Sequence, residues 1–382
     1  MNPGGTGDRP PVALISRTAV YSSILIVRLS ALGDVVHVLP SLAAIRDAFP
    51  KAKIGWAIED KAAKLLQGHP QIDRLHVIPR KELTRAAKSG RGLTALGGAR
   101  RVLTELRGEG YEVALDFQSN FRSAFLTRLS GAPLRVGQPS PHAKEGSHLF
   151  YSRVPPGMPF ERHKIVRNLN LLRAIGLDPE PQRVALPVAE HPDIEAALPK
   201  RRGRPWVALH AGVSAFGAIK AWRPERFAEL ARGLVLAGAD VFFCWGGDSE
   251  RKQAQALTES APGTFMAPET ALSQLAWFLE QVDLFVGVDS GPLHVAAAMG
   301  TPVLGLYGPK HVSTYGPFWS NGVTIAADYP CSPCRHRRCP LPEAKETIAP
   351  DGSRVRISPC MDTIRSENAL EIARSMLPAM GV

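Results

Sequence analysis

The chain has 382 residues, of which 45% are hydrophobic, 21% charged and 7% aromatic. This length exceeds one ordinary hydrophobic core and predicts a packed soluble protein with two domains of roughly 150 to 200 residues each. No stretch approaches the roughly 20 apolar residues that cross a bilayer. A net charge of +11 predicts a surface that attracts nucleic acid, an anionic membrane or a phosphorylated glycolipid. Because no run interleaves basic with aromatic residues, nucleic acid is the least favoured of the three.

Residues 1–20 are rich in Gly and Pro without periodicity and predict a disordered leader. The apolar segment beyond residue 12 is interrupted by Arg17 and Arg28, which argues against a secretory signal and for a cytoplasmic protein. In the next domain, residues 21–180, apolar runs alternate with amphipathic segments, and strands are expected at 23–28, 53–58, 74–78 and 112–117. The alternation predicts a parallel sheet covered by helices.

Residues 181–203 are dense in Pro and charge, which is typical of a linker between domains. A second alternating series fills residues 204–361, with strands expected at 206–211, 240–245, 284–288 and 302–307. The chain is therefore predicted to be an α/β protein of two similar domains. A helix within residues 362–382 could pack back on the first domain.

Ligands of open parallel sheets bind beyond the carboxyl ends of the strands, so the residues there are the first candidates for a site. In VRLSALGDVVHVLP, Gly33 would allow a tight turn, and Asp34 would sit near a helix start and face the cleft. The alternative is that Asp34 only caps that helix. His37 is expected to be a partly buried helix residue.

A second candidate is the segment from His210 to Phe227, a loop of small and hydroxyl residues that includes Ser214 and is followed by Lys220. Backbone amides that can be approached closely, together with one ammonium group, suit a diphosphate. A plain surface lysine is the alternative interpretation.

The most specific segment is DLFVGVDSGPLHVAAAMGTPVLGLYGP, in which an apolar strand ends at Asp289, Ser290 and Gly291. A proline-opened helix follows, whose free amides make an anion site, and Ser290 and His294 can add donors. These features favour a nucleotide-diphosphate site, although His294 could be a structural histidine. In WGGDSERK, Asp248 or Glu250 could hold ribose hydroxyls, or both could be solvated surface charges.

Four of the five cysteines cluster late in the sequence, namely Cys331, Cys334, Cys339 and Cys360. In a cytosolic protein this pattern indicates a structural zinc or an iron–sulfur site before disulfides. The alternatives are four reduced thiols or a redox-labile pair, so the sequence does not decide whether the cysteines bind a metal.

The segments LIVRLSALGDVVHVLPSL, HAG with Lys220 and AWRPERF, and VGVDSGPLHVAAAMGTPVLGLYGP resemble glycosyltransferase family 9, the ADP-heptose lipopolysaccharide heptosyltransferases. The resemblance runs in order from about Leu25 to the cysteine segment, including CSPC, CP and CM. It implies a GT-B fold, in which two Rossmann-like domains face each other across a cleft. It also implies inverting transfer of a heptose from ADP-heptose, without a cofactor or catalytic metal, to the Kdo/heptose inner core of lipopolysaccharide, a lipid A/Kdo-type anionic glycolipid. The enzyme would then be cytoplasmic and peripherally bound to the inner face of the cytoplasmic membrane.

The resemblance also implies roles for residues of this chain. Asp34 matches the family's proposed catalytic base and Lys220 its phosphate-binding lysine, while the donor-binding set is Ser214, Glu250, Asp289, Ser290, Gly291 and His294. Where several members have a hydroxyl-rich phosphate loop, this sequence has Ser214 followed by Ala215, Phe216 and Gly217, so backbone donors must contribute more. Acceptor choice is expected in first-domain loops at 81–101 and 138–163, which are basic and irregular in sequence.

Two other functions compete with this interpretation. A GT-B transferase or an epimerase that uses another nucleotide-sugar would share the scaffold, and an epimerase would need no acceptor. A basic nucleic-acid-binding protein with a Cys-bound zinc would leave Asp34, Lys220 and the Asp289 turn unexplained.

Overall fold

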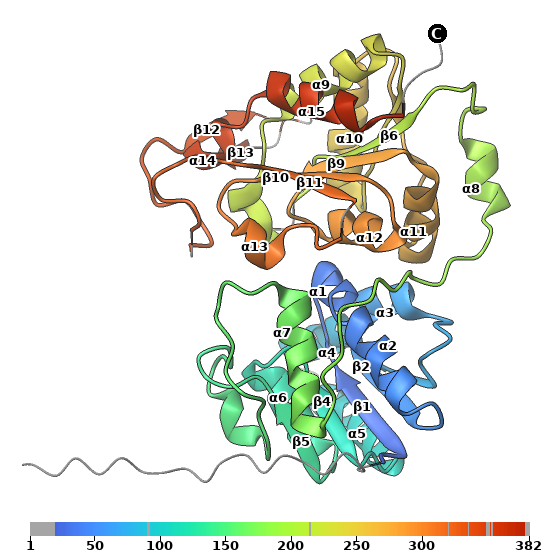
Figure 1. Cartoon of the computed structure of the whole chain (residues 1–382), viewed down its shortest axis with the longest axis vertical. Helices are drawn as coiled ribbons and strands as arrows, with labels where there is room; N and C mark the ends of the chain where they lie inside the picture. Colours follow the sequence, from blue (N-terminus) through green and yellow to red (C-terminus); the bar gives the residue numbers. More distant parts are fainter. Residues whose placement is uncertain are drawn as a thin grey trace, which may run out of the picture.

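A computed structural model of the chain shows two domains, one above the other, each built around its own sheet (Figure 1). The structure describes residues 20–89, 92–213, 215–319, 321–334, 336–348, 352 and 354–378. The expected leader, apart from Val20, and the candidate Ser214 lie outside these residues.

The first sheet has five parallel strands in the order β3-β2-β1-β4-β5. Every residue of the central strand β1 is buried because helices cover both faces of the sheet, and its SILIV sequence is correspondingly apolar. The strands are β1 (Ser23–Val27), β2 (Lys53–Glu59), β3 (Arg74–Ile78), β4 (Val113–Asp116) and β5 (Leu134–Gly137). The helices are α1 (Leu32–Val36), α2 (Leu39–Ala48), α3 (Asp60–Leu66), α4 (Arg80–Lys88), α5 (Gly92–Gly108), α6 (Phe121–Leu129) and α7 (Lys164–Leu171), with 3-10 turns η1 (Ser147–Phe150) and η2 (Leu172–Ile175).

The second sheet is parallel and has the order β11-β10-β9-β6-β7-β8. Its strands are β6 (Trp206–His210), β7 (Asp240–Phe243), β8 (Phe265–Met266), β9 (Leu284–Val288), β10 (Val303–Tyr307) and β11 (Gly322–Ala326). The surrounding elements are η3 (Ala215–Lys220), α9 (Pro224–Leu236), α10 (Asp248–Ser260), α11 (Leu272–Gln281), α12 (Gly291–Met299), α13 (Val312–Tyr315), α14 (Pro359–Asp362) and α15 (Ser366–Met376). A separate hairpin pairs β12 (Lys345–Ile348) with β13 (Arg354–Ile357).

In each sheet the order in which successive strands are added reverses once, and the place between the two strands where it reverses indicates where a ligand binds. In the first sheet β1 lies beside β4, and in the second β6 lies beside β9. Ligands of doubly wound sheets bind at these switch points, beyond the carboxyl ends of the strands. Asp34 follows β1, Lys220 follows β6 and Asp289 follows β9, so the topology places all three at switch points.

The two carboxyl edges face each other because α1 of the first domain packs on α12 of the second. The two helices approach so closely that each domain has a glycine at the contact. A Cβ on Gly33 would lie 2.6 Å from His294 Cδ2, and a Cβ on Gly291 would lie 2.9 Å from Leu32 Cδ2. Gly33 lies inside α1, so its missing side chain serves domain contact rather than the tight turn that the sequence suggested.

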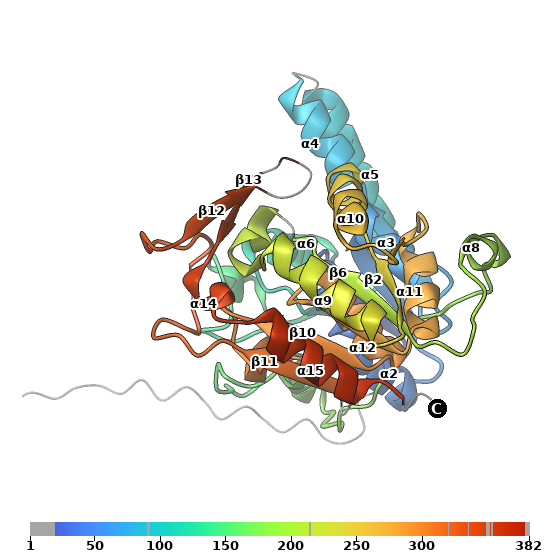
Figure 2. The same ribbon diagram turned by 90° about the horizontal axis from the view of Figure 1, so that it is seen from above.

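Some first-domain segments are more regular than their sequence suggested. The stretch 81–101, expected as an irregular loop, falls largely within α4 and α5, which pack together and extend beyond the rest of the domain (Figure 2). The charged side chains of these helices face solvent, so few apolar residues remain to show helical spacing in the sequence. In the stretch 138–163 the only helical element among the described residues is the short turn η1.

The C-terminal helix α15 packs against α9 of the second domain, and Ala369 and Ala373 are part of that domain's core. The idea that it returns to the first domain is wrong, since its apolar face is covered within the second. The linker contains one helix, α8 (Pro192–Ala197), and buries Leu186 in the core cluster that joins both domains. Within the described residues, no helix has the length and apolar character needed to span a bilayer.

Candidate active site

Asp34 is held by two cations of the first domain. Its Oδ2 lies 2.5 Å from Arg28 Nη2, and its Oδ1 accepts a hydrogen bond from Lys164 Nζ at 2.9 Å. The N-cap of α1 is Ala31, and no side chain caps the helix. Asp34 is therefore not a capping residue, and its carboxylate is directed to charged partners at the domain edge.

These partners fix the charge of Asp34. Burial acts to raise the pKa of the carboxyl, but the Arg28 guanidinium and the Lys164 ammonium overcome it and hold the pKa well below the usual range. Burial lowers the pKa of Lys164, and Asp34 opposes that shift. Asp34 is thus an ionised carboxylate at neutral pH, able to accept a hydrogen bond from a hydroxyl. Arg28 and Lys164 were not predicted as site residues.

On the second domain, Lys220, Asp289 and His294 form one connected group. Lys220 Nζ donates to the Asp289 carbonyl and lies 3.1 Å from Asp289 Oδ2. His294 Nε2 lies 3.2 Å from Asp289 Oδ1, so it carries the proton and donates it. Burial acts to raise the pKa of Asp289, but the His294 hydrogen bond and the Lys220 charge lower it overall. The lysine is therefore not a plain surface residue.

The start of α12 offers donors beside this group. Ser290 is its N-cap residue, yet its side chain caps nothing, and its buried Oγ has no hydrogen-bond partner among the described residues. Gly291 begins the helix, and the free amides of a helix start are the usual place for an anion to bind. Together they could bind a phosphate.

Glu250 lies at the same edge of the second sheet, in the first turn of α10. Its Oε2 is 3.5 Å from His210 Nε2, and the hydrogen bond to His210 lowers the pKa of Glu250. A Cβ on Gly212 would lie 2.7 Å from Glu250 Cδ, so the glycine makes room for the carboxylate. Glu250, rather than the neighbouring Asp248, turns back toward the ends of β6 and β7, where a ribose could be held.

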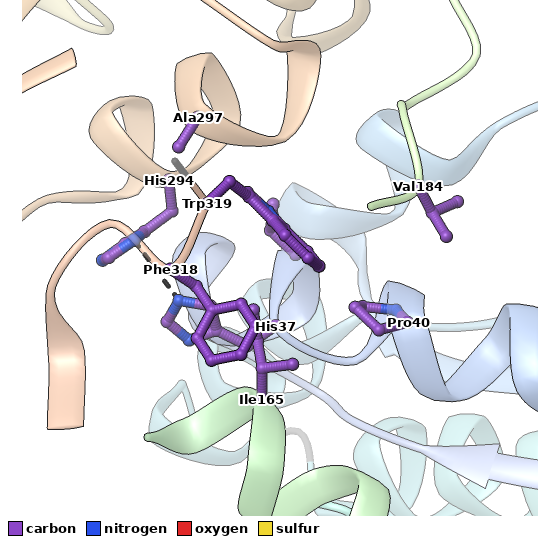
Figure 3. A pocket seen from close by; sticks show the side chains of 9 residues that line it. His37, Pro40, Ile165, Val184, His294, Ala297, Phe318 and Trp319 are labelled. Carbon is purple, nitrogen blue, oxygen red and sulfur yellow. Dashed lines mark hydrogen bonds between the residues drawn. The ribbon is translucent and has the colours of Figure 1, made fainter. Parts of the chain in front are cut away.

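A histidine pair links the two halves of the site (Figure 3). His37 Nε2 lies 3.3 Å from His294 Nδ1, across the domain interface. Because His294 donates from Nε2 to Asp289, its Nδ1 accepts, and His37 must donate. His37 was expected to be a partly buried helix residue, and it lies at the C-cap of α1 and is more deeply buried than expected, with 4% of its surface exposed. Its bond to His294 was not foreseen.

His163 makes a second bridge, in which its Nε2 donates to the Gly316 carbonyl of the second domain at 2.9 Å. The gap between the domains here is small, with a volume of about 10 Å³, room for about one water molecule. Its lining residues include His37, Ile165, Val184, His294, Phe318 and Trp319 (Figure 3). It is a packed domain contact and too small for a sugar.

Two further second-domain residues lie near the proposed site. Burial raises the pKa of Tyr315, and the Asp34 and Asp289 carboxylates both add to that rise, so Tyr315 lies near both domain edges. Lys310, three residues beyond β10, interacts with Lys220 and Asp289. Neither was singled out from the sequence, although the position of Lys310 after a strand was an available signal.

The cysteines do not form a metal centre in the part of the chain that the structure describes, where no group of three or more His, Cys, Asp or Glu side chains is arranged to hold an ion. All five are free thiols. Cys360 is buried in the second core, which raises its thiol pKa to about 11, whereas Cys331 is exposed. A structural zinc or iron–sulfur site is therefore not supported by the arrangement of the described residues.

Comparison with known proteins identifies the family. The model of glycosyltransferase family 9 (heptosyltransferase) matches residues 99–345. Lipopolysaccharide heptosyltransferase 1 of Pseudomonas aeruginosa is 30% identical over 331 residues, which cover 85% of this chain and 89% of that protein. Lipopolysaccharide heptosyltransferase 1 of Escherichia coli K12 is 27% identical over 80% of this chain and 93% of its own length.

Solved structures agree on the fold. The E. coli heptosyltransferase WaaC with ADP-2-deoxy-2-fluoro heptose is 25% identical with a TM-score of 0.65, covering 80% of this chain and 93% of that one. E. coli ADP-heptose lps heptosyltransferase II is 20% identical with a TM-score of 0.69 over 93% of this chain and 98% of that one. The expected GT-B arrangement of two Rossmann-like domains is confirmed. The chain is a glycosyltransferase and belongs to glycosyltransferase family 9.

Proposed function

We propose that this enzyme transfers a heptose, with inversion, from ADP-heptose to the Kdo/heptose inner core of lipopolysaccharide. The observation that carries the proposal is the arrangement of Asp34 on one domain edge and of Lys220, Asp289 and His294 on the edge that faces it. The names of the relatives and the ADP-heptose analogue held by one similar structure support this donor and acceptor.

In the proposed reaction, the Asp34 carboxylate accepts the proton of an acceptor hydroxyl. The hydroxyl oxygen forms a bond to the anomeric carbon while the bond from that carbon to the diphosphate breaks on the opposite face, and ADP leaves with the electron pair. The low pKa of Asp34 keeps it ready as an acceptor, and transfer becomes favourable as the attacking oxygen gains positive charge.

The leaving diphosphate would be stabilised by fixed positive charge. Lys220 is paired with Asp289 in the free protein, and we propose that a donor phosphate replaces part of that contact. The unpartnered Ser290 hydroxyl and the amides at Gly291 would supply hydrogen bonds. Glu250 would bind the ribose hydroxyls, and Ser214 remains a proposed donor contact. With this set in place, transfer is proposed to need neither a divalent metal nor another cofactor.

The acceptor would lie against the first domain, where cations gather near Asp34. Arg80 and Arg122 both pair with the buried Glu59, beside the Arg28 and Lys164 pairs. Such a surface suits a Kdo-type anionic glycolipid, which implies work at the inner face of the cytoplasmic membrane. We propose residues 21–180 as the acceptor domain, 181–203 as the linker and 204–361 as the nucleotide-sugar domain.

The test is a calorimetric titration of the purified enzyme with ADP-heptose, ADP and UDP-sugars in EDTA, repeated with Asp289→Ala and, as a control, with Asp248→Ala. Selective adenine-nucleotide binding that only Asp289→Ala abolishes would support the proposal. A preference for a UDP-sugar would overturn the donor assignment.

Product analysis separates the remaining alternatives. Turnover of ADP-heptose that requires a Kdo-containing acceptor supports transfer, whereas a changed sugar without acceptor would mean an epimerase. Salt-sensitive binding of DNA or RNA, with no nucleotide-sugar binding, would revive the nucleic-acid interpretation.

A further inference from the structure

Helix α6 and the turn η1 expose a cluster of apolar side chains, here called the aromatic patch: Phe121, Phe125, Leu149 and Phe150. The Phe121 and Phe125 rings stack with centroids 5.9 Å apart, and Phe150 meets them edge-on at 5.6 and 6.2 Å. Phe121 is 51% exposed, Phe125 45% and Leu149 78%. Exposed apolar side chains that gather in this way mark an interaction surface more often than single ones do.

The local sequence explains why these rings face outward. Asn120 caps α6 and exchanges hydrogen bonds with Ser123 in a capping box, which fixes the start of the helix. From that start, Ser123, Ala124 and Thr127 are buried. Phe121 and Phe125, four residues apart, are thereby left on the exposed face of the helix.

Basic residues surround the aromatic patch. Arg122 and Arg128 are exposed on α6, and Lys144 and His148 are exposed beside η1. Two acidic side chains also lie here, since Arg122 pairs with Glu59 and Glu145 accepts a hydrogen bond from the Phe121 amide. An apolar centre with a mostly basic border complements a surface that has an apolar interior and anionic headgroups.

The aromatic patch lies next to the acceptor side of the proposed site. Helix α6 follows the carboxyl end of β4, where the Phe117 carbonyl accepts a hydrogen bond from Arg28, the partner of Asp34. Burial lowers the pKa of Lys164, the partner of Asp34, and the nearby positive charge of Lys144, at the border of the patch, adds to that shift. Figure 1 shows α6 within the first domain.

We propose that the aromatic patch docks this enzyme on the surface of an anionic phospholipid bilayer. This inference rests on the proposed function, because a lipid-linked acceptor keeps its acyl chains in the membrane while its sugars reach Asp34. Aromatic rings lie favourably at the boundary between headgroups and acyl chains, and the surrounding cations are attracted to anionic lipid.

The test measures binding of the full chain to sedimented vesicles of phosphatidylethanolamine with and without phosphatidylglycerol. The Phe125→Gln/Leu149→Gln double variant should lower the vesicle-bound fraction about tenfold, since it removes two apolar groups from the lipid contact. Leu236→Gln is the matched control, because Leu236 is 89% exposed on the second domain and outside the patch. Arg128→Glu should weaken binding only when phosphatidylglycerol is present, with Lys252→Glu on α10 as its control.

Activity assays separate this inference from the proposed function. The double variant should keep wild-type turnover on a deacylated, water-soluble acceptor and lose about tenfold on the same acceptor in vesicles. Equal vesicle binding by the double variant and Leu236→Gln would overturn the docking surface, even with normal heptose transfer. Self-association that the double variant abolishes, without vesicle binding by the wild type, would also overturn it and assign the patch to a second copy of the chain. Failure of the wild type to use ADP-heptose with either acceptor would instead overturn the proposed function.

Discussion

The imidazole of His37 donates from Nε2 to Nδ1 of His294, 3.3 Å away on the other domain. His294 in turn donates to Asp289, so one hydrogen-bond chain runs from α1, the helix of Asp34, to the group that contains Lys220. The Nδ1 atom of His37 has no hydrogen-bond partner among the described residues. Because the two hydrogen bonds connect the domains, we infer that the histidine pair aligns the proposed acceptor and donor edges.

Replacing His37 should slow transfer without abolishing donor binding. His37→Leu leaves the buried Nδ1 of His294 unpaired, and we expect a loss of about 10-fold to 100-fold in kcat with a small change in the Kd of ADP. His37→Gln keeps a donor and should recover part of the rate. Steady-state kinetics with thermal melts as a folding control would measure both, and equal kcat values for the Leu variant and the wild type would refute the role.

Removing Lys220 should reduce turnover more strongly. Its ammonium lies 3.1 Å from Oδ2 of Asp289, two residues before α12 begins, and loss of one such electrostatic donor costs about 100-fold or more in rate. Lys220→Ala should therefore lower kcat by at least that factor. Lys252→Ala, an exposed lysine on α10, should leave kcat unchanged, and near-normal turnover by Lys220→Ala would remove it from catalysis.

The charge of Asp34 makes the pH dependence testable. Its pKa lies well below the usual range despite burial, because Arg28 and Lys164 oppose the burial effect. The carboxylate is then ionised throughout the neutral range, and kcat should show no fall from its protonation between about pH 5 and 8.

Lys164→Met removes a cation and a hydrogen bond from Asp34, so the Asp34 pKa should rise and kcat should fall at low pH. Asp34→Asn should lose about 100-fold to 10,000-fold at every pH. Lys51→Met, at an exposed turn, is the control for a changed lysine. A pH–rate profile of Lys164→Met that overlays the wild type would contradict the pairing.

Buried histidines should make the fold sensitive to acid. Burial lowers the pKa of His163 to about 4 and that of His69 to about 4. Between about pH 6.5 and 4 these histidines are protonated in the unfolded chain but neutral in the folded chain. The free energy of unfolding therefore falls as the pH drops through this range. The loss is about 3 kcal/mol at most for each histidine.

Denaturant unfolding across that range would measure the effect. His163→Gln should flatten the pH dependence, because Gln takes up no proton in either state, whereas His336→Gln at an exposed position should not. An unchanged slope in His163→Gln would show that this histidine titrates alike in both states.

The sequence predicted the features that depend on local pattern. Strands β3 and β9 begin and end at the expected residues. Strand β9 is a continuous apolar run and fully buried, which is the pattern of a central parallel strand, whereas β3 is a partly exposed edge strand that alternates polar and apolar residues. Asp34, Lys220 and Asp289 could be found because they follow strands. The pairing of Asp34 with Lys164 could not be found in this way. Lys164 lies 130 residues away in the sequence, and only the packing of the folded domain brings the two side chains together.

Other errors have equally physical causes. Helix α4 carries Arg80, Lys81, Arg85 and Lys88, and its one long apolar side chain, Leu83, lies against Gly98 of α5. One such residue is too little of an apolar stripe to identify the helix from sequence. The cysteine spacing suggested a metal, but spacing carries no information on burial, and Cys360 belongs to the core. His37 looked structural because its partner is on the other domain.

The two glycines at the domain interface are reciprocal, since Gly33 leaves room for His294 and Gly291 leaves room for Leu32. Each domain thus carries the space that the other domain's side chain occupies. A chimera that joins this first domain to a relative's second domain should keep the proposed acceptor and donor edges in register only if the incoming helix begins with glycine. The two domains are therefore complementary at this contact. If the second domain binds the donor as proposed, its specificity is better changed by replacing side chains within that domain than by exchanging the whole domain.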